Sequence, residues 1–189
     1  MKLCTYQSPK GPRVGVVADG NVFDGNWGGT MTDLIRDWPS ARAGLEKAVD
    51  QGRGLPLDDV QLLAPILRPG KIFAIGLNYA DHIAESKLGT PEHQVWFTKA
   101  VTSVNGPYSP VQIPTISQFV DYEVELVAVI GEGGRHIPAG SAAEHIFGYC
   151  VGNDVTERLW QHRTPQWSLG KSFDTHAPIG PWNHNGRCP

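Results

Sequence analysis

Two glutamates, Glu123 and Glu125, stand two residues apart inside the apolar stretch of residues 121–130. Because side chains alternate between the two faces of a β-strand, a strand here directs both carboxylates to one face. Like charges side by side repel each other, and burying either one unpaired costs several kcal/mol. A cation between them removes that cost, and a divalent metal ion is the simplest candidate.

Asp154 follows the next apolar strand at a Gly-Asn-Asp turn and can supply a third oxygen. An all-oxygen site suits Mg²⁺, Mn²⁺ or Ca²⁺ and disfavours zinc or copper. The alternative is that Glu123 and Glu125 line the solvated face of an amphipathic edge strand. Val127 and Val129 continue the same face, which weakens that alternative, but the residues alone leave both interpretations open.

A second group of polar residues has helical spacing. His82 and Glu85 lie three apart on a helix predicted to start near Asn78, so they share a face and can form a general-base pair. An ordinary surface pair has the same spacing. Arg158 and Gln161 are also three apart, and Arg158 can hold a substrate carboxylate through two hydrogen bonds.

Lys171 lies in the short stretch of residues 169–173 and can pair with the carboxylates or hold an anionic substrate. Taken singly, Lys171, Arg158 and Gln161 each fit a solvated surface better than a binding site.

Composition limits the protein class. With 189 residues, 40% hydrophobic and 19% charged, the chain suits one globular domain with or without a small N-terminal module. A net charge of -3 without any basic run argues against nucleic acid, and no apolar segment reaches membrane-spanning length. The N-terminus lacks a signal-peptide pattern, so we expect a cytoplasmic protein.

Residues 1–66 resemble a small α/β module that precedes a larger domain at residues 67–189. Asp19-Gly20 predicts a hairpin, and Thr30 with Asp33 predicts a capping box that opens a short helix. Ser40 is the expected cap of a second helix that ends at Gly52.

In the larger domain the pattern predicts strands at residues 71–76, 95–99 and 149–152. Residues 155–163 are expected to be helical. Residues 167–173 are expected to return to the sheet.

Several ungapped blocks between residues 71 and 182 together resemble the fumarylacetoacetate hydrolase family in its shorter, mainly bacterial form. The blocks, in order, are Gly76-Leu77-Asn78-Tyr79-Ala80-Asp81-His82, Phe97-Thr98-Lys99, Asp121-Tyr122-Glu123-Val124-Glu125-Leu126, residues 148–154, Arg158 with Gln161, and residues 170–182 apart from His176.

The resemblance implies an α+β, mainly β fold: a mixed β-roll, usually dimeric, after a small N-terminal domain. It implies that Glu123, Glu125 and Asp154 bind Mg²⁺ or Mn²⁺, with Ca²⁺ as a third candidate. His82 and Glu85 on a lid helix would activate water, Lys171 would polarise the substrate, and Arg158 and Gln161 would contact its acid end.

The activities implied are carbon–carbon bond hydrolysis, decarboxylation or dienol ketonisation of small 2-oxo or 1,3-dicarbonyl acids. The chain leaves the family pattern after Trp182, so we expect an incomplete roll with exposed sheet edges. Two function classes therefore stay open: a metal-dependent hydrolase or lyase, and an inactive remnant that binds metal or a partner chain. A purely structural domain would require solvent-facing carboxylates.

Overall fold

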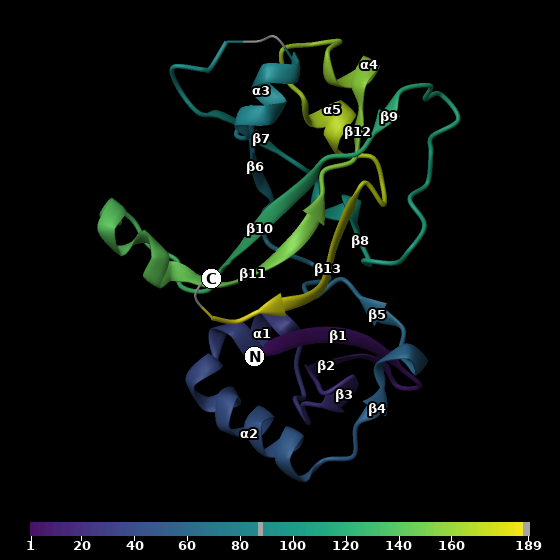
Figure 1. Cartoon of the computed structure of the whole chain (residues 1–189), viewed down its shortest axis with the longest axis vertical. Coiled ribbons are helices and arrows are strands. Elements are labelled where there is room, and N and C mark those ends of the chain that lie inside the picture. Colours follow the sequence, from purple (N-terminus) through teal and green to yellow (C-terminus); the bar gives the residue numbers. More distant parts are fainter. Residues whose placement is uncertain (87–88, 187–189) are drawn as a thin grey trace.

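The computed structural model describes residues 1–86 and 89–186, without the side chains of His82, Glu85 and Ser86. Within this part a nine-stranded sheet runs in the order β10-β11-β13-β1-β2-β3-β4, with β5 on β1 and β8 on β13. Two short ribbons, β12-β9 and β6-β7, lie apart from it (Figure 1). Every pairing is antiparallel except β13 with β8, so the sheet is mixed.

The strands are β1 (Lys2–Ser8), β2 (Gly11–Ala18), β3 (Asn21–Asp24), β4 (Leu55–Pro56), β5 (Leu62–Leu63), β6 (Phe73–Gly76), β7 (Val95–Thr98), β8 (Val104–Asn105), β9 (Val120–Asp121), β10 (Val124–Ile130), β11 (Ile146–Asn153), β12 (Thr156–Glu157) and β13 (Ala177–His184). The α-helices are α1 (Met31–Arg36), α2 (Trp38–Gln51), α3 (Ala80–Ser86), α4 (Arg158–Gln161) and α5 (Ser168–Lys171). In the described residues, 3₁₀ turns cover Leu57–Asp59, Val101–Ser103 and Ala139–His145.

The N-terminal part contains the predicted hairpin. Asp19 and Gly20 connect β2 to β3 with φ of 47° and 71°, the left-handed conformation that a two-residue turn of this kind requires. The capping box is also confirmed, because Thr30 Oγ1 accepts from Asp33 N and Asp33 accepts from Thr30 N.

The cap predicted for the second helix is wrong. α2 begins at Trp38 after Asp37, so Ser40 lies inside its first turn. Pro39 explains the earlier start, since proline is favoured in the first turn, where no N–H is needed. The predicted end at Gly52 is confirmed.

The main core joins the N-terminal part to the long strands. Helices α1 and α2, strands β1 and β2, and strands β10 and β11 contribute to one buried cluster: Leu3, Val14, Val16, Met31, Leu34, Ile35, Ala41, Leu45, Val129, Phe147 and Cys150. On the other face of β1 and β2 a second cluster contains Cys4, Tyr6, Val17, Val22 and Leu62. The division into domains at residue 66 stays a prediction, while pairing of β1 with β13 makes the sheet continuous.

The strand expected over residues 121–130 is divided in two. Asp121 belongs to β9, which pairs with β12, whereas β10 begins at Val124 and pairs with β11. Glu123 therefore lies between two strands, where its N–H donates to the Asn153 side chain over 3.0 Å.

Two further expectations need correction. Residues 155–163 are not one helix, because Thr156 and Glu157 form β12 and only four residues, α4, are helical. The Glu157 carboxylate ends the strand by accepting from Trp160 N over 2.6 Å, which caps the new helix. Residues 168–171 form helix α5 instead of returning to the sheet.

Candidate active site

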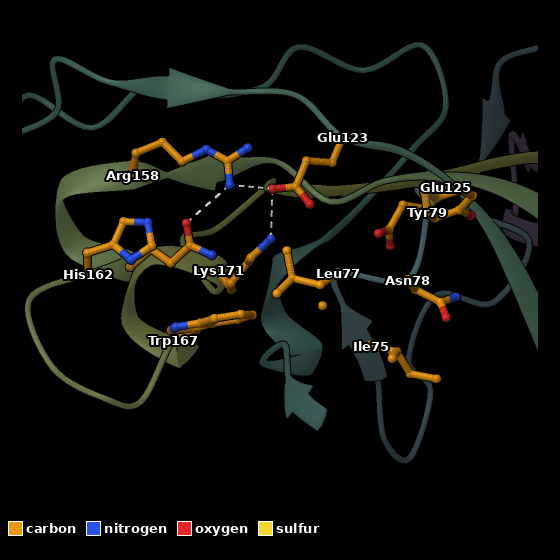
Figure 2. Close-up of a pocket in the computed structure, with 12 residues that line it drawn as sticks. Ile75, Leu77, Asn78, Tyr79, Glu123, Glu125, Arg158, His162, Trp167 and Lys171 are labelled. Carbon is orange, nitrogen blue, oxygen red and sulfur yellow. Dashed lines mark hydrogen bonds and ion pairs between the residues drawn. The ribbon is translucent and has the colours of Figure 1, made fainter. Parts of the chain in front are cut away.

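A pocket opens where the ends of β6, β10, α4 and α5 meet (Figure 2). Its lining combines charged groups with aromatic and aliphatic side chains: Ile75, Gly76, Leu77, Asn78, Tyr79, Glu123, Glu125, Arg158, Gln161, His162, Trp167 and Lys171. Gly76 lies against the Trp167 ring, where an added Cβ would come within 2.4 Å of it, so this wall needs glycine. Five of the predicted site residues line this cavity: Glu123, Glu125, Arg158, Gln161 and Lys171.

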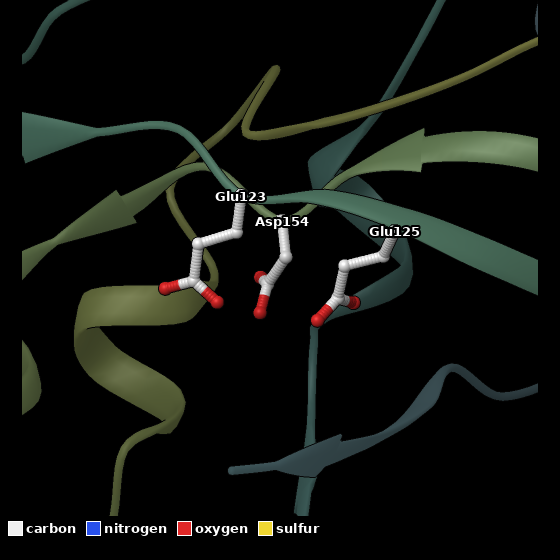
Figure 3. Close-up of side chains that lie close together, drawn as sticks. All are labelled: Glu123, Glu125 and Asp154. Carbon is white, nitrogen blue, oxygen red and sulfur yellow. The ribbon is translucent and has the colours of Figure 1, made fainter. Parts of the chain in front are cut away.

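Three carboxylates converge beside the pocket: Glu123 and Glu125 line it, and Asp154 is buried next to them. One oxygen from each of Glu123, Glu125 and Asp154 lies within 4.8 Å of the others. The backbone explains the convergence: Glu125 pairs with Gly152 across β10 and β11, and Asp154 N donates to Glu123 O over 2.8 Å. Figure 3 shows the three side chains leaving neighbouring ribbons in the same direction. The predicted proximity is therefore observed.

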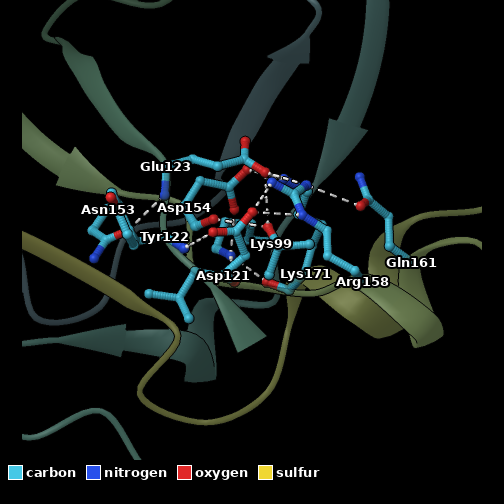
Figure 4. A network of polar contacts seen from close by, with 11 residues as sticks. Lys99, Asp121, Tyr122, Glu123, Asn153, Asp154, Arg158, Gln161 and Lys171 are labelled. Carbon is cyan, nitrogen blue, oxygen red and sulfur yellow. Dashed lines mark hydrogen bonds and ion pairs between the residues drawn. The ribbon is translucent and has the colours of Figure 1, made fainter. Parts of the chain in front are cut away.

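Cationic side chains balance these carboxylates (Figure 4). Lys171 Nζ donates to Glu123 Oε1 over 3.0 Å and to Asp154 Oδ2 over 2.5 Å. Arg158 Nη1 lies 2.5 Å from Glu123 Oε1. The side chains of Asp154 and Lys171 are 3% and 2% exposed, so neither charge would be tolerated without its partner.

Lys99 is a member of this network that reasoning from the sequence did not single out. Its ammonium lies 2.6 Å from Asp154 Oδ1, and burial lowers its pKa. A lysine at the end of an apolar strand was the available signal, because such a side chain either turns to solvent or needs an acidic partner inside.

Burial strongly affects the Glu125 carboxyl. Burial, together with the negative charges of Asp154 and Glu123, raises its pKa from 4.5 to about 7. A cation placed beside Glu125 would offset the repulsion from these two carboxylates.

Arg158 and Gln161 share one face of α4, as their spacing predicted. Arg158 Nη1 donates to Gln161 Oε1 over 3.1 Å, while Nε and Nη2 donate to Asp121 Oδ2 over 3.0 and 2.7 Å. Burial alone would lower the pKa of Arg158, but the bonds with Asp121 and the charge of Glu123 raise it. Asp121, from the separate strand β9, is a partner that sequence reasoning did not assign.

The backbone of His82 and Glu85 lies in α3, and their side chains lie outside the described part of the structure. Tyr79, directly before helix α3, connects this region to strand β10, because its hydroxyl accepts a hydrogen bond from Leu126 N over 3.0 Å. Leu77, two residues before Tyr79, has a φ of 54°. This left-handed conformation is unusual for a non-glycine residue, and it occurs in the turn between β6 and α3.

The donor set fits a hard divalent cation. Three carboxylate oxygens from separate backbone positions face one point, and such oxygens are the ligands that Mg²⁺, Mn²⁺ and Ca²⁺ take in proteins. Lys171 Nζ bridges Glu123 and Asp154, so a single positive charge is already accommodated between two of the three groups.

Comparison with known proteins places this geometry in a family. Residues 71–187 match the family described as fumarylacetoacetate (FAA) hydrolase C-terminal. The chain is 39% identical over 193 aligned positions to oxaloacetate tautomerase FAHD2A, mitochondrial, of Homo sapiens, covering 96% of this chain and 62% of the relative.

Two solved structures have the same fold. The fumarylacetoacetate hydrolase of psychrophilic Exiguobacterium antarcticum is 35% identical, with a TM-score of 0.83 over 98% of this chain and 66% of its own. A maleylpyruvate hydrolase of Sphingobium sp. SYK-6, solved with manganese(II) and pyruvate, is 28% identical, with a TM-score of 0.80 over 98% of this chain and 67% of its own.

These matches confirm the predicted α+β, mainly β fold, and they show that the chain spans about 62% of the length of the curated relative. The sequence match, the fold and the extent of the alignment agree. The chain therefore belongs to the fumarylacetoacetate hydrolase family.

Proposed function

We propose that the chain is a divalent-metal-dependent enzyme that cleaves or rearranges carbon–carbon bonds next to the carbonyl of small 2-oxo or 1,3-dicarbonyl acids. The observation that supports this most is the convergence of Glu123, Glu125 and Asp154 within 4.8 Å, two of which, Glu123 and Glu125, line the pocket. When bound there, Mg²⁺ or Mn²⁺ would polarise the 2-oxo group and stabilise the enolate that forms.

In this proposal Lys171 contributes a positive charge to the pocket. Its ammonium, now between Glu123 and Asp154, can turn to an anionic substrate oxygen once another cation neutralises those carboxylates. Phe97 and Trp167 enclose this region, with ring centroids 5.5 Å apart, and Lys171 Nζ lies 4.8 Å from the Phe97 centroid. These rings exclude water around the ammonium and strengthen its interaction with an anion.

Arg158 and Gln161 are the proposed contacts for the distal acid group of the substrate. Both line the pocket, and the guanidinium is held in place by Asp121 and Glu123. A substrate carboxylate would share the guanidinium with these acidic partners, which makes its binding sensitive to the position of Asp121.

His82 and Glu85 are proposed as the pair that activates water. Support comes from their helix, α3, which follows Asn78 and Tyr79 on the pocket wall. A histidine beside a carboxylate has the basicity needed to deprotonate water near neutral pH.

The relatives support the substrate class. The names oxaloacetate tautomerase and maleylpyruvate hydrolase describe activities on 2-oxo acids, and the hydrolase was solved with manganese and pyruvate. For this chain we therefore propose Mg²⁺ or Mn²⁺, with Ca²⁺ as a weaker candidate, and hydrolysis, decarboxylation or keto–enol rearrangement as the reactions to compare.

The direct test is a substrate panel with the purified chain. Oxaloacetate, an acylpyruvate and a dienol acid would be assayed with Mg²⁺, Mn²⁺ or chelator, following enol absorbance and pyruvate release separately. We expect metal-dependent turnover that Glu125→Gln abolishes and that Glu46→Gln, an exposed exchange on α2, leaves unchanged. Turnover that persists in chelator, or in Glu125→Gln, would refute the proposal.

A second candidate is a chain that binds metal or a partner without turnover. The apolar side chains exposed on β10 and β11 favour it, because such surfaces commonly serve as contacts. Metal binding with no turnover of any panel member would select this candidate.

Other expectations concern location and partners. Among the described residues, no helix combines the length and apolar character needed to cross a membrane. The cytoplasmic location, the lack of a nucleic-acid partner and the homodimer stay predictions.

A further inference from the structure

Lys99 does not line the pocket; it contacts the three carboxylates through the buried Asp154. It follows β7, and its side chain is 4% exposed. The ammonium donates to Asp154 Oδ1 over 2.6 Å, to Val155 O over 3.2 Å and to the backbone oxygen of Lys171. An ammonium has three N–H donors and no acceptor, so these three oxygens saturate it.

The first of these bonds determines how Asp154 can be used. Lys99 occupies Oδ1, while Oδ2 accepts from Lys171 in the pocket. One Asp154 oxygen is thus bonded to the buried Lys99, and the other is bonded to Lys171, which lines the pocket. Asp154 therefore offers one oxygen, in a fixed direction, to a cation in the pocket.

The remaining bonds fix the element that carries Lys171. Helix α5 has four residues and no side-chain cap at its start, so little within it holds its orientation. Lys99 Nζ binds the last carbonyl of this helix, and the neighbouring Ala100 N donates to Ser172 Oγ over 2.9 Å. The segment after β7 is thus attached to the end of α5.

We propose that Lys99 is a positioning residue: from outside the pocket it sets both the direction of Asp154 Oδ2, the oxygen that Lys99 does not bind, and the direction of the Lys171 side chain. This inference rests on the proposed function, because it assigns Asp154 to a metal. The Lys99 ammonium bonds both to Asp154 and to helix α5. An ordinary buried ion pair would involve the carboxylate alone.

Metal affinity separates this role from a purely electrostatic one. A positive charge 2.6 Å from Asp154 repels a cation, so removing it without moving Asp154 would strengthen metal binding. If Lys99 instead holds Asp154 in position, removing it would weaken metal binding. Removing an outer partner of a metal ligand typically lowers metal affinity about 10–100-fold.

The experiment is a calorimetric Mn²⁺ titration of the full chain, without substrate, for wild type, Lys99→Met and Lys99→Arg. Lys99→Met removes the charge at similar volume, and Asp154 keeps Lys171 as a partner. Lys99→Arg keeps the charge and changes the donor geometry. Lys47→Met, on the exposed face of α2, is the matched control.

We expect both Lys99 variants to weaken Mn²⁺ binding about tenfold or more, with Lys47→Met equal to wild type. Tighter or unchanged binding in Lys99→Met, or wild-type affinity in Lys99→Arg, would overturn the inference. If Lys99→Met fails to fold in a urea titration, Lys99→Arg decides the question, because its charge stays paired.

A metal-free measurement separates this inference from the proposed function. Hydrogen exchange of residues 168–173 should accelerate in both Lys99 variants and not in Lys47→Met. Absence of Mn²⁺ binding in the wild type would refute the metal site, while unchanged exchange in the Lys99 variants would independently refute the positioning role.

Discussion

Strands β1 and β2 are buried on both faces, whereas β10 and β11, in the same sheet, are buried on one. Leu3 and Val16 face the main core while Cys4 and Val17 face the second cluster. On β10, Val129 faces the main core, but the opposite face exposes Val124, Leu126 and Ile130, at 68%, 59% and 60%. Val151 of β11, paired with Leu126, is 55% exposed.

The two parts of this sheet therefore have different roles, one in packing and one in building the site. At β1 and β2, burial on both faces yields a rigid platform, because fully packed side chains cannot shift independently. At β10, the face that packs Val129 into the core also directs Glu125 toward the pocket, because the two residues are four apart on one strand. The exposed face is apolar along its length, as is typical of contact surfaces.

A matched pair of leucines gives the largest expected contrast. Leu34→Ala in the main core should lower the free energy of unfolding by about 2–5 kcal/mol, since it removes buried methyl groups and leaves a cavity. Leu126→Ala on the exposed face should cost about 0.5 kcal/mol or less. Urea denaturation of both variants checks this, and equal losses would mean that Leu126 is buried in solution.

The exposed face should also bind hydrophobic dye and promote association. Leu126→Lys with Val151→Lys should reduce dye fluorescence and concentration-dependent association, because it places charges on the apolar strip. Light scattering over a concentration series measures the second effect. Variants that leave both signals at wild-type levels would show that this face is already covered.

Two carboxyl groups, Asp24 on β3 and Glu125 on β10, should make the free energy of unfolding depend on pH in opposite directions. The hydrogen bond from Arg13, with others from Tyr6 and Asn26, lowers the pKa of Asp24 from 3.8 to about 2, so its contribution is present above pH 3.8 and is lost as pH falls toward 2. Burial raises the pKa of Glu125 from 4.5 to about 7, so the folded state binds the proton more readily than the unfolded chain. Its contribution is therefore present below pH 4.5 and is lost as pH rises through 7.

Urea titrations from pH 2.5 to 8 in chelator test both signs. Asp24→Asn should flatten the low-pH limb, and Glu125→Gln should remove the decline between pH 4.5 and 7. A Glu125→Gln profile that still declines in that range would contradict the account of Glu125. A saturating divalent cation should also remove the decline in the wild type.

The smallest effect concerns the start of α1. Thr30→Ala removes the side-chain acceptor for Asp33 N and should lower stability by about 1 kcal/mol. Thr30→Ser keeps the acceptor and is the control. Thermal unfolding of the two variants measures the difference, and equal melting temperatures would show that the cap contributes nothing.

Local signals in the sequence predicted much of this structure. The Asp19-Gly20 turn and the Thr30–Asp33 box depend on neighbouring residues only, and both are present. The alternation of Glu123 and Glu125 predicted their common direction, although Glu123 lies just before β10. The segment at residues 168–171 was mispredicted because the bond from Lys99 to the carbonyl at its end joins residues 72 apart in sequence, which no local pattern contains.

The same distinction applies to the site. Arg158 with Gln161 could be predicted from helical spacing, and Glu123, Glu125 and Asp154 from strand alternation and a turn. Lys99 and Asp121 reach the site only through tertiary contacts with Asp154 and Arg158, 55 and 37 residues away in sequence. Spacing along the chain cannot reveal such pairs.

The central claim is that three carboxylates bind one divalent cation. Its most direct test is anomalous diffraction from crystals of the chain soaked with Mn²⁺. The account predicts a single peak about 2.0–2.6 Å from one oxygen each of Glu123, Glu125 and Asp154, with Lys171 displaced from between Glu123 and Asp154. A fully soaked crystal with no peak there, and with Lys171 still bound to both carboxylates, would contradict it.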